Sequence, residues 1–124
     1  MAAYKPGACN IGKNEIIKRY ALGAVGIVAA MAIISLYVAF SLPRLVLLVC
    51  FIPLFLGFEG IYQGYFKFCA GFAARGIYDL TGSGGKRGAV RNSNAHREDM
   101  RKAMSINFYS LITAVLLTFL IYLL

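Results

Sequence analysis

The chain has 124 residues, of which 60% are hydrophobic and 15% are charged, and it carries a formal net charge of +8. A water-soluble fold of this length could not bury so much apolar surface, so the composition excludes an ordinary soluble domain. We therefore expect a single membrane domain over residues 1–124, an integral membrane protein of the all-α class.

The first apolar block covers residues 20–40, a stretch without a charged residue. At about 1.5 Å per residue its length matches the ~30 Å hydrocarbon core, so we predict a transmembrane helix over residues 20–41. Pro43 disfavours helical geometry at Leu42 and ends this helix. We expect Asn14 to cap a polar extension before it. A cleaved signal peptide fits less well, because the apolar run is longer than a signal core.

The second apolar block begins at Leu45, and residues 45–58 carry no charge. As a helix, this stretch would span only about 21 Å, which is too short to cross a bilayer. The predicted transmembrane helix must therefore extend through Glu59 to about residue 66. Pro53 removes one backbone donor, and we expect a kink there.

Glu59 is a notable carboxylate because it follows directly on this apolar run. Gln63 and Lys67 follow at four-residue steps, which places all three side chains on one face of a helix. Gly60 and Gly64 accompany them at a spacing that lets helices approach closely. We predict that these five residues form an interface with another helix, from this chain or a partner. The alternatives are that Glu59 snorkels to the membrane edge, pairs with Lys67 through Gln63, or handles a proton or ion.

Beyond residue 66, apolar residues recur at three- and four-residue spacing. This pattern predicts an amphipathic interfacial helix over residues 67–80, lying on the cytoplasmic surface of the membrane. Glycines at positions 82, 84 and 85 then favour a cytoplasmic loop over residues 81–93. A third transmembrane helix, with a cytoplasmic extension at its start, is expected over residues 94–124.

Lysine and arginine are distributed unevenly along the chain. Four precede the first predicted helix and Arg44 alone lies between the first two. Eight lie between the second helix and Met104, near which the third helix is expected to enter the membrane. Short basic segments stay in the cytoplasm, so the N-terminus is expected inside and the C-terminus in the periplasm or outside the cell. Anionic lipid headgroups account for the basic charge, without any nucleic acid. The residues expected to contact headgroups are Lys86, Arg87, Arg91, Arg97, Arg101 and Lys102.

Residue types that carry chemistry are sparse in this sequence. His96 is the only histidine, and Cys9, Cys50 and Cys69 form no C-x-x-C pair. The stretch GSGGKR lacks the first glycine and the Ser/Thr of a phosphate-binding loop. We expect no enzymatic activity, no cofactor and no metal site. The predicted orientation does place Cys9 and Cys69 on the same side of the membrane, where they could meet as a thiol pair.

The stretch CNIGKNEIIKRYALG, residues 9–23, resembles the opening of the YgaP-like transmembrane domain family of small bacterial inner-membrane domains. Ile16 stands where that family often has arginine, and the family's later Cys-Pro segment is missing. The rest of the chain resembles uncharacterised three-helix bacterial membrane proteins. The resemblance implies a bacterial inner membrane and names no reaction. The residues that match the family's opening are Asn10, Ile11, Gly12, Glu15, Arg19 and Gly23.

Four residues of this motif suggest an anchor at the membrane edge. Asn10 and Gly12 suit a turn, and Glu15 suits the first turn of a helix, near its positive dipole end. Glu15 and Arg19 are four positions apart and can form an ion pair. Arg19 is expected at the level of the headgroups, where it would fix how the first helix enters the bilayer.

The function that we expect is that of a non-catalytic accessory or scaffold subunit of a larger membrane complex, acting through helix packing. Its partners would be membrane lipids and either other membrane subunits or further copies of the chain. One alternative is a homo-oligomeric small transporter or channel with Glu59 in its pathway. Another is a thiol or sulfur-handling membrane protein that uses Cys9 and Cys69.

Overall fold

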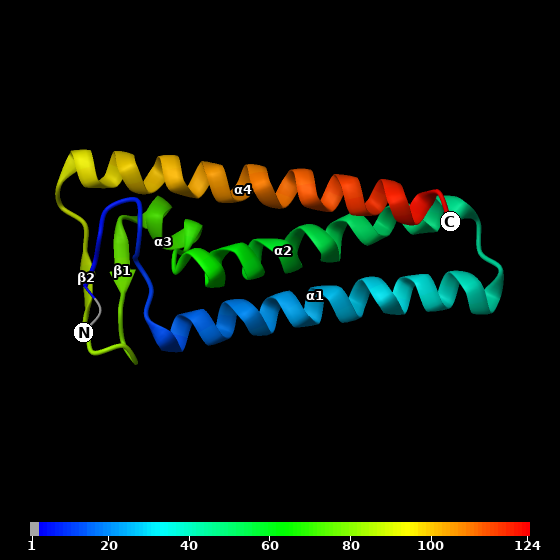
Figure 1. Ribbon diagram of the computed structural model, residues 1–124, viewed down its shortest axis with the longest axis horizontal. Coiled ribbons are helices and arrows are strands. Elements are labelled where there is room, and N and C mark those ends of the chain that lie inside the picture. The colour runs from blue at the N-terminus through cyan, green and yellow to red at the C-terminus, as the bar shows by residue number, and fades with distance from the viewer. Residues whose placement is uncertain (1–2) are drawn as a thin grey trace.

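The computed structural model describes residues 3–124. In Figure 1 the three long helical segments run side by side, and the short elements gather with the N-terminal segment at one end. We call this end the cap and define it as residues 3–12 and 67–92. The elements, in chain order, are α1 (Lys13–Phe40), the 3₁₀ helix η1 (Arg44–Cys50), α2 (Phe51–Phe66), α3 (Ala70–Arg75), β1 (Ile77–Asp79), β2 (Arg87–Ala89) and α4 (Ser93–Tyr122).

Three helical segments of the described chain are long and apolar enough to cross a membrane, namely Lys13–Phe40, Arg44–Phe66 and Ser93–Tyr122. The expectation of three such helices is confirmed at this level. The first one begins earlier than the apolar block, because its polar extension is helical from Lys13 onward. Asn14 does not cap it. Gly12 is the N-cap residue, and its carbonyl accepts from the N–H of Ile16 at 3.0 Å.

The second long segment changes its helical geometry near Pro53. Residues 44–50 are wound as a 3₁₀ helix, and the α-helical pattern begins only at Phe51. Pro53 has no N–H with which to bond the carbonyl of Val49 in an α-helix. The tighter 3₁₀ winding therefore precedes the proline, where the α-helical hydrogen-bond ladder would be incomplete.

The predicted helix over residues 67–80 is not continuous. Lys67 has a left-handed backbone with φ +56°, and the N–H of Phe68 donates to the Gln63 carbonyl at 2.9 Å, which ends α2. The short helix α3 follows, and Gly76, with φ +67°, ends it in the same way. The apolar spacing that suggested one helix thus arises from two helix ends and a strand, and within the predicted range only the six residues of α3 are α-helical.

A small β-hairpin also departs from the expected all-α class and from the expected loop over residues 81–93. β1 pairs antiparallel with β2, with Ile77 opposite Ala89 and Asp79 opposite Arg87. Gly82 and Gly84 both have positive φ values and reverse the chain between the strands. The hairpin gives residues 77–79 backbone partners that a helix would otherwise have supplied.

α1 and α2 touch through their backbones because glycines line the contact. A Cβ atom on Gly26 would lie 2.5 Å from the carbonyl oxygen of Pro53 and 2.6 Å from the Cα of Gly57. A Cβ atom on Gly60 would lie 2.5 Å from the carbonyl oxygen of Arg19. Only residues without a side chain allow two helices to approach this closely.

α4 closes the bundle against the second long segment. Towards the end opposite the cap, the buried residues Ala30, Cys50, Leu54 and Ala114 form one apolar cluster. Nearer the cap, Phe68, Ala73, Ala103 and Ile106 form a second cluster, which joins α3 to α4. The cap is therefore held to the bundle by apolar packing as well as by the polar contacts described below.

Candidate functional site

Glu59 lies on α2 and faces α4, and two amide side chains donate hydrogen bonds to its carboxylate. It is only 9% exposed, and the Nε2 of Gln63 donates to its Oε2 at 2.8 Å. With its side-chain amide turned so that the nitrogen faces the carboxylate, Asn107 donates to both oxygens of Glu59, at 2.8 and 3.1 Å. A buried carboxylate needs such donors, and here one chain supplies them.

The five residues expected at one helix interface contact different neighbours. Glu59 and Gln63 are hydrogen-bonded to each other, and Glu59 faces α4. Gly60 packs against the backbone of α1. Gly64 lies under the ring of Tyr20, and a Cβ atom on Gly64 would lie 3.0 Å from that ring. Successive residues of an α-helix point about 100° apart, which explains how neighbours in the sequence reach different helices. Lys67 follows the end of α2 and is exposed.

Asn10 is fully buried at the centre of the cap. Its Nδ2 donates to the carbonyl of Cys69 at 3.0 Å, and the N–H of Cys69 donates to its Oδ1 at 2.6 Å. Its own N–H donates to the carbonyl of Lys67, and its carbonyl accepts from the N–H of Asp79. Asn10 therefore joins the end of α2, the start of α3 and β1.

Gly12 continues this contact along the hairpin. Its N–H donates to the carbonyl of Asp79 at 2.8 Å. A Cβ atom at this position would lie 2.6 Å from the backbone carbonyl of Leu80, which leaves no room for a side chain. The N-terminal segment thus lies directly against β1 just before α1 begins.

Glu15, Arg19 and Cys69 link the start of α1 to α3. Glu15 forms ion pairs with Lys18 at 3.1 Å and with Arg19 at 3.2 Å, so the expected Glu15–Arg19 pair is confirmed. The Nη2 of Arg19 also donates to the Sγ of Cys69 at 3.1 Å. The Arg19 guanidinium lies 5.7 Å from the centre of the Phe72 ring. Arg19 thereby connects two helices of the same chain.

Tyr4 and Asp99 were not singled out from the sequence. Asp99 is fully buried, and it accepts from the hydroxyl of Tyr4 at 2.6 Å and from the N–H of Gly7 at 2.8 Å. Burial of Tyr4 and its hydrogen bond to Asp99 raise the pKa of the Tyr4 hydroxyl. The Tyr4 ring stacks on Tyr78 with centroids 4.8 Å apart. These contacts fasten the N-terminal segment to α4 and to the hairpin.

The basic residues expected to contact headgroups have different surroundings. Lys102 lies over the ring of Phe66, with its Nζ 4.0 Å from the ring centre. Arg87 forms an ion pair with Asp79 at 2.8 Å, although most of its side chain is exposed. The hydroxyl of Thr81 and the guanidinium of Arg87 hold the pKa of Asp79 below its usual value. Four others are exposed, and these are Lys86, Arg91, Arg97 and Arg101.

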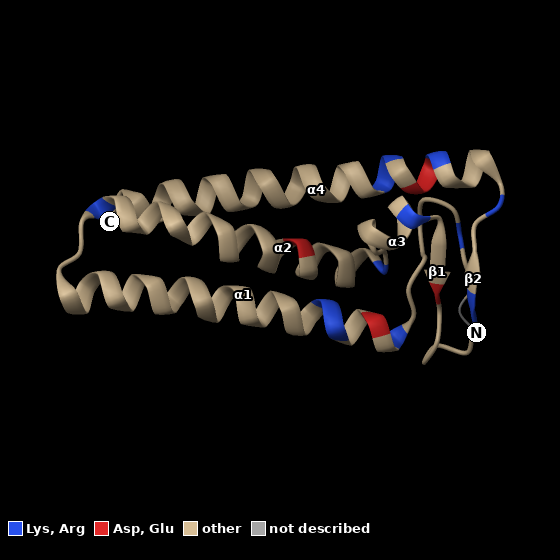
Figure 2. Ribbon diagram, turned by 180° about the vertical axis from the view of Figure 1, so that it is seen from behind, with Lys and Arg blue, Asp and Glu red and all other residues tan. Residues whose placement is uncertain are grey.

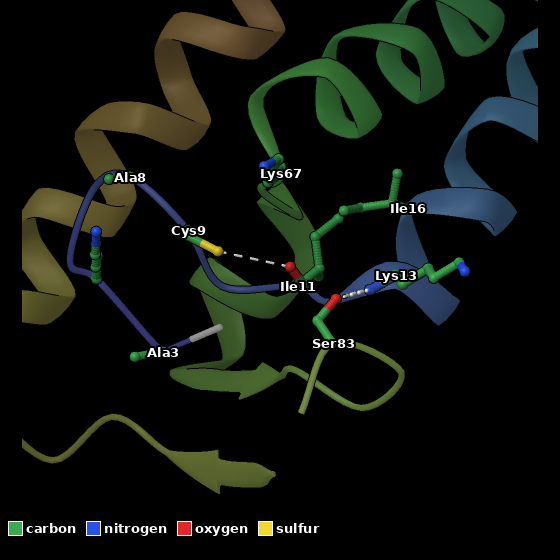
Figure 3. A pocket seen from close by; sticks show the side chains of 9 residues that line it. Ala3, Ala8, Cys9, Ile11, Lys13, Ile16, Lys67 and Ser83 are labelled. Atoms are coloured by element: carbon green, nitrogen blue, oxygen red, sulfur yellow. Dashed lines mark hydrogen bonds between the residues drawn. The ribbon is translucent and has the colours of Figure 1, made fainter. Parts of the chain in front are cut away.

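The cysteines are free thiols. Cys50 is buried in the bundle, and Cys69 is buried beside Arg19. The thiol of Cys9 donates to the carbonyl of Ile11 at 3.6 Å and lies on the wall of a cavity in the cap (Figure 3). Across residues 3–124, no group of three or more His, Cys, Asp or Glu side chains is placed to hold a metal ion.

No protein-family model, curated protein or solved structure shows significant similarity to the chain.

Proposed function

We propose that the protein is embedded in a bacterial inner membrane and acts as a non-catalytic accessory or scaffold subunit of a larger complex, through helix packing. The observation that carries this proposal is the apolar surface of its long helices. On α1 alone, Val25, Val28, Met31 and Val38 are 61–70% exposed. Apolar surface on this scale needs lipid or other apolar helices to cover it.

The distribution of charge supports the proposed orientation. Figure 2 shows lysine and arginine concentrated at the cap end of the bundle. Arg44 begins η1, away from the cap, and its guanidinium lies over the ring of Tyr122 near the end of α4. Basic segments near membrane helices stay in the cytoplasm, so the cap would lie inside the cell. The C-terminus would then lie in the periplasm or outside. The resemblance of residues 9–23 to the YgaP-like family implies a bacterial inner membrane, and that location stays a prediction.

The polar groups within the bundle favour a packing role over transport. The carboxylate of Glu59 receives hydrogen bonds from Gln63 and Asn107 of the same chain. The glycine contact between α1 and α2 brings backbone against backbone. Both features serve to position helices, which is what a scaffold requires. For a channel or transporter that uses Glu59, these bonds would have to be exchanged for those of a passing ion.

Photo-crosslinking from defined positions tests this proposal in living cells. A photoreactive amino acid at Val28, which is 65% exposed, should give a crosslink to a membrane protein of one defined mass. The matched control is Phe68, an aromatic residue that is fully buried against residues of the same chain and should give none. A subunit interface predicts a defined product from Val28. Crosslinks to lipid alone from Val28 and from other outward positions of α1 and α4 would contradict the proposal.

A thiol role is the second candidate, and one contact favours it. The guanidinium of Arg19 lies 3.1 Å from the sulfur of Cys69. Reactive cysteines have electropositive surroundings of this kind. The test is the double variant Cys9→Ser with Cys69→Ser, with Cys50→Ala as the control for loss of a thiol elsewhere. Under the leading proposal the double variant should still assemble, and cells that carry it should behave like cells with the parent protein. Loss of a sulfur-dependent phenotype with assembly intact would favour the second candidate.

A further inference from the structure

The cap contains a cavity of about 600 Å³, within the size range of small-molecule sites. Its walls come from segments far apart in the sequence, because the N-terminal segment, the start of α1, the end of α2 and the β1–β2 turn all contribute. Figure 3 shows Cys9 and Ile11 on one wall, with Ser83, Lys13 and Lys67 around them. Folding of the cap therefore creates this site from residues that no local motif brings together.

Three lysines line the cavity, and no acidic residue does. They are Lys5, Lys13 and Lys67, and none of them forms an ion pair with any residue between positions 3 and 124. The carboxylates of Glu15 and Asp79 do not offset these lysines, because Glu15 pairs with Arg19 and Asp79 pairs with Arg87. The cavity is thus left with a local excess of positive charge, which favours an anion.

Lys67 occupies a backbone position where glycine is normally preferred. Its φ of +56° lies in the left-handed region, at the residue that ends α2. Glycine would adopt this conformation with less strain, as Gly76 does at the end of α3. A lysine at this position adopts its backbone conformation at some energetic cost, and the residue lines the cavity.

Ser83 can supply a neutral hydrogen-bond donor to an anion in this cavity. Its Oγ accepts from the backbone N–H of Lys13 at 2.7 Å, which holds the β1–β2 turn against the start of α1. This bond uses an acceptor site of the hydroxyl and leaves its hydrogen available as a donor. A hydroxyl and lysine side chains that line one cavity are donors of the kind that suit phosphate oxygens.

From these features we infer that the cavity binds a phosphate-bearing anion, and specifically the headgroup of an anionic phospholipid. The choice of a lipid rests on the proposed membrane location. Lys67 directly follows the second candidate span, and Ile16 lies one turn before the apolar block of α1 begins. Both residues would then lie at headgroup depth. Ile11 and Ile16 give the cavity an apolar wall beside its lysines, which suits a molecule with a polar head and an apolar tail.

The first experiment measures lipid retention. The protein is reconstituted in nanodiscs of phosphatidylcholine with some phosphatidylglycerol, and native mass spectrometry counts the lipids that stay bound after release. Retention of one phosphatidylglycerol is expected. Replacing Lys5, Lys13 and Lys67 with Gln should weaken its binding about a hundredfold, at about fivefold per lysine. Replacing Lys18, Arg44 and Arg75 with Gln is the control, since it removes equal charge outside the cavity and outside the residues expected to contact headgroups, and it should leave that lipid bound.

Lys67→Gly separates binding from folding. Glycine relieves the left-handed strain, so this variant should be at least as stable as the parent and yet bind phosphatidylglycerol more weakly. A parent and a triple lysine variant that retain the lipid equally well would overturn the inference. So would a parent that retains phosphatidylcholine as well as phosphatidylglycerol.

A second arm uses inorganic phosphate on protein in phosphate-free detergent, with the amide resonances of Lys13 and Lys67 as the readout. Shifts of these resonances that the triple variant abolishes would support the cavity as a phosphate site even without lipid. If phosphate binds but no lipid is retained, the anion site stands and the lipid assignment is overturned. If the protein does not enter nanodiscs, the proposed membrane role fails, and this arm still tests the cavity. No response in either arm overturns the site itself.

Discussion

The side-chain amide of Asn10 and the backbone of Cys69 exchange two hydrogen bonds, at 3.0 and 2.6 Å, in the interior of the cap. An amide side chain can act in this way because it offers a donor and an acceptor on adjacent atoms. Through this pairing the Asn10 side chain supplies both hydrogen-bond partners that a neighbouring backbone segment would otherwise supply to Cys69, in the turn between α2 and α3. The cap is therefore a folded unit around Asn10, and the following predictions test it and the bundle that it covers.

Replacing Asn10 with Ala should open the cap. The change leaves the N–H of Cys69 buried without a partner, whereas the Cys69 carbonyl keeps the bond from the N–H of Ala73. The free energy of unfolding should therefore fall by about 1–3 kcal/mol. Hydrogen exchange of the Cys69 amide should speed up directly, since it donates to the Asn10 side chain. Exchange of the Asp79 amide, which donates to the backbone carbonyl of residue 10, should speed up only if the cap opens. Asn94→Ala, at an exposed asparagine, is the control. Unchanged exchange in Asn10→Ala would mean that the cap does not depend on this residue.

Bulk at Gly60 should harm the protein more than loss of charge at Glu59. Gly60→Leu must push the backbone of Arg19 away and separate α1 from α2. We expect this to cost about 1–3 kcal/mol, as overpacking of a core does. Glu59→Gln keeps its size and can still bond Gln63 and Asn107, so it should cost only about 0.6 kcal/mol. The measurement is the yield and melting temperature of folded protein in mild detergent.

Gly71→Ala is the matched control for Gly60, because its Cβ atom would meet nothing closer than the Cys69 sulfur at 3.8 Å. It should fold like the parent. The packing account of Glu59 would be wrong if Gly60→Leu folded normally while Glu59→Gln abolished function in an intact protein. A charge-handling role for Glu59 would then replace it.

Acid should loosen the β-hairpin through Asp79. Its hydrogen bond from Thr81 and its ion pair with Arg87 hold its pKa below the ordinary value of 3.8, so the folded cap prefers the ionised form. This stabilisation is fully present above pH 3.8 and is lost as the pH falls through the lower folded-state pKa. Amide protection of β1, compared between the parent and Asp79→Asn at each pH, measures it. The difference between the two proteins should shrink in acid, and a constant difference would refute the assignment.

The long helices could be predicted from the sequence because their signal is local. An apolar block of membrane-spanning length identifies its own helix, whatever the rest of the chain does. The start of α4 near Ser93 is local too, since the side chain of Asn92 accepts from the N–H groups of Asn94 and Ala95. The glycines at 60 and 64 were recognised by their spacing. On α1, Gly26 faces Gly57 and Gly23 lies near Gly60, and the three-residue spacing of Gly23 and Gly26 is a signal that could have identified them.

The cap could not be predicted because its contacts are distant in the sequence. Tyr4 reaches Asp99 and Asn10 reaches Cys69, and no periodic pattern records such pairs. Residues 67–80 carry apolar residues at helical spacing, yet the left-handed residue Lys67 separates them from α2 and the left-handed residue Gly76 divides them. Lysine is seldom found in this conformation, so its position gives little warning of a helix end.

Reporter fusions test the orientation of the chain in the membrane. A reporter that is active only outside the cytoplasm should work when fused after Leu124 and should fail when inserted at Gly84, in the β1–β2 turn. The reason is the concentration of basic residues at the cap end. The opposite pattern of activity would reverse the orientation and place the lysine-lined cavity outside.

Native mass spectrometry of the protein, purified in mild detergent from its own membrane, tests the central proposal most directly. An accessory or scaffold subunit should be recovered with at least one different membrane protein, in a fixed ratio. Gly60→Leu should reduce recovery of that assembly, whereas Gly71→Ala should leave it unchanged. Recovery of this chain alone, or only as copies of itself, from gently treated membranes would contradict the account and favour the homo-oligomeric alternative.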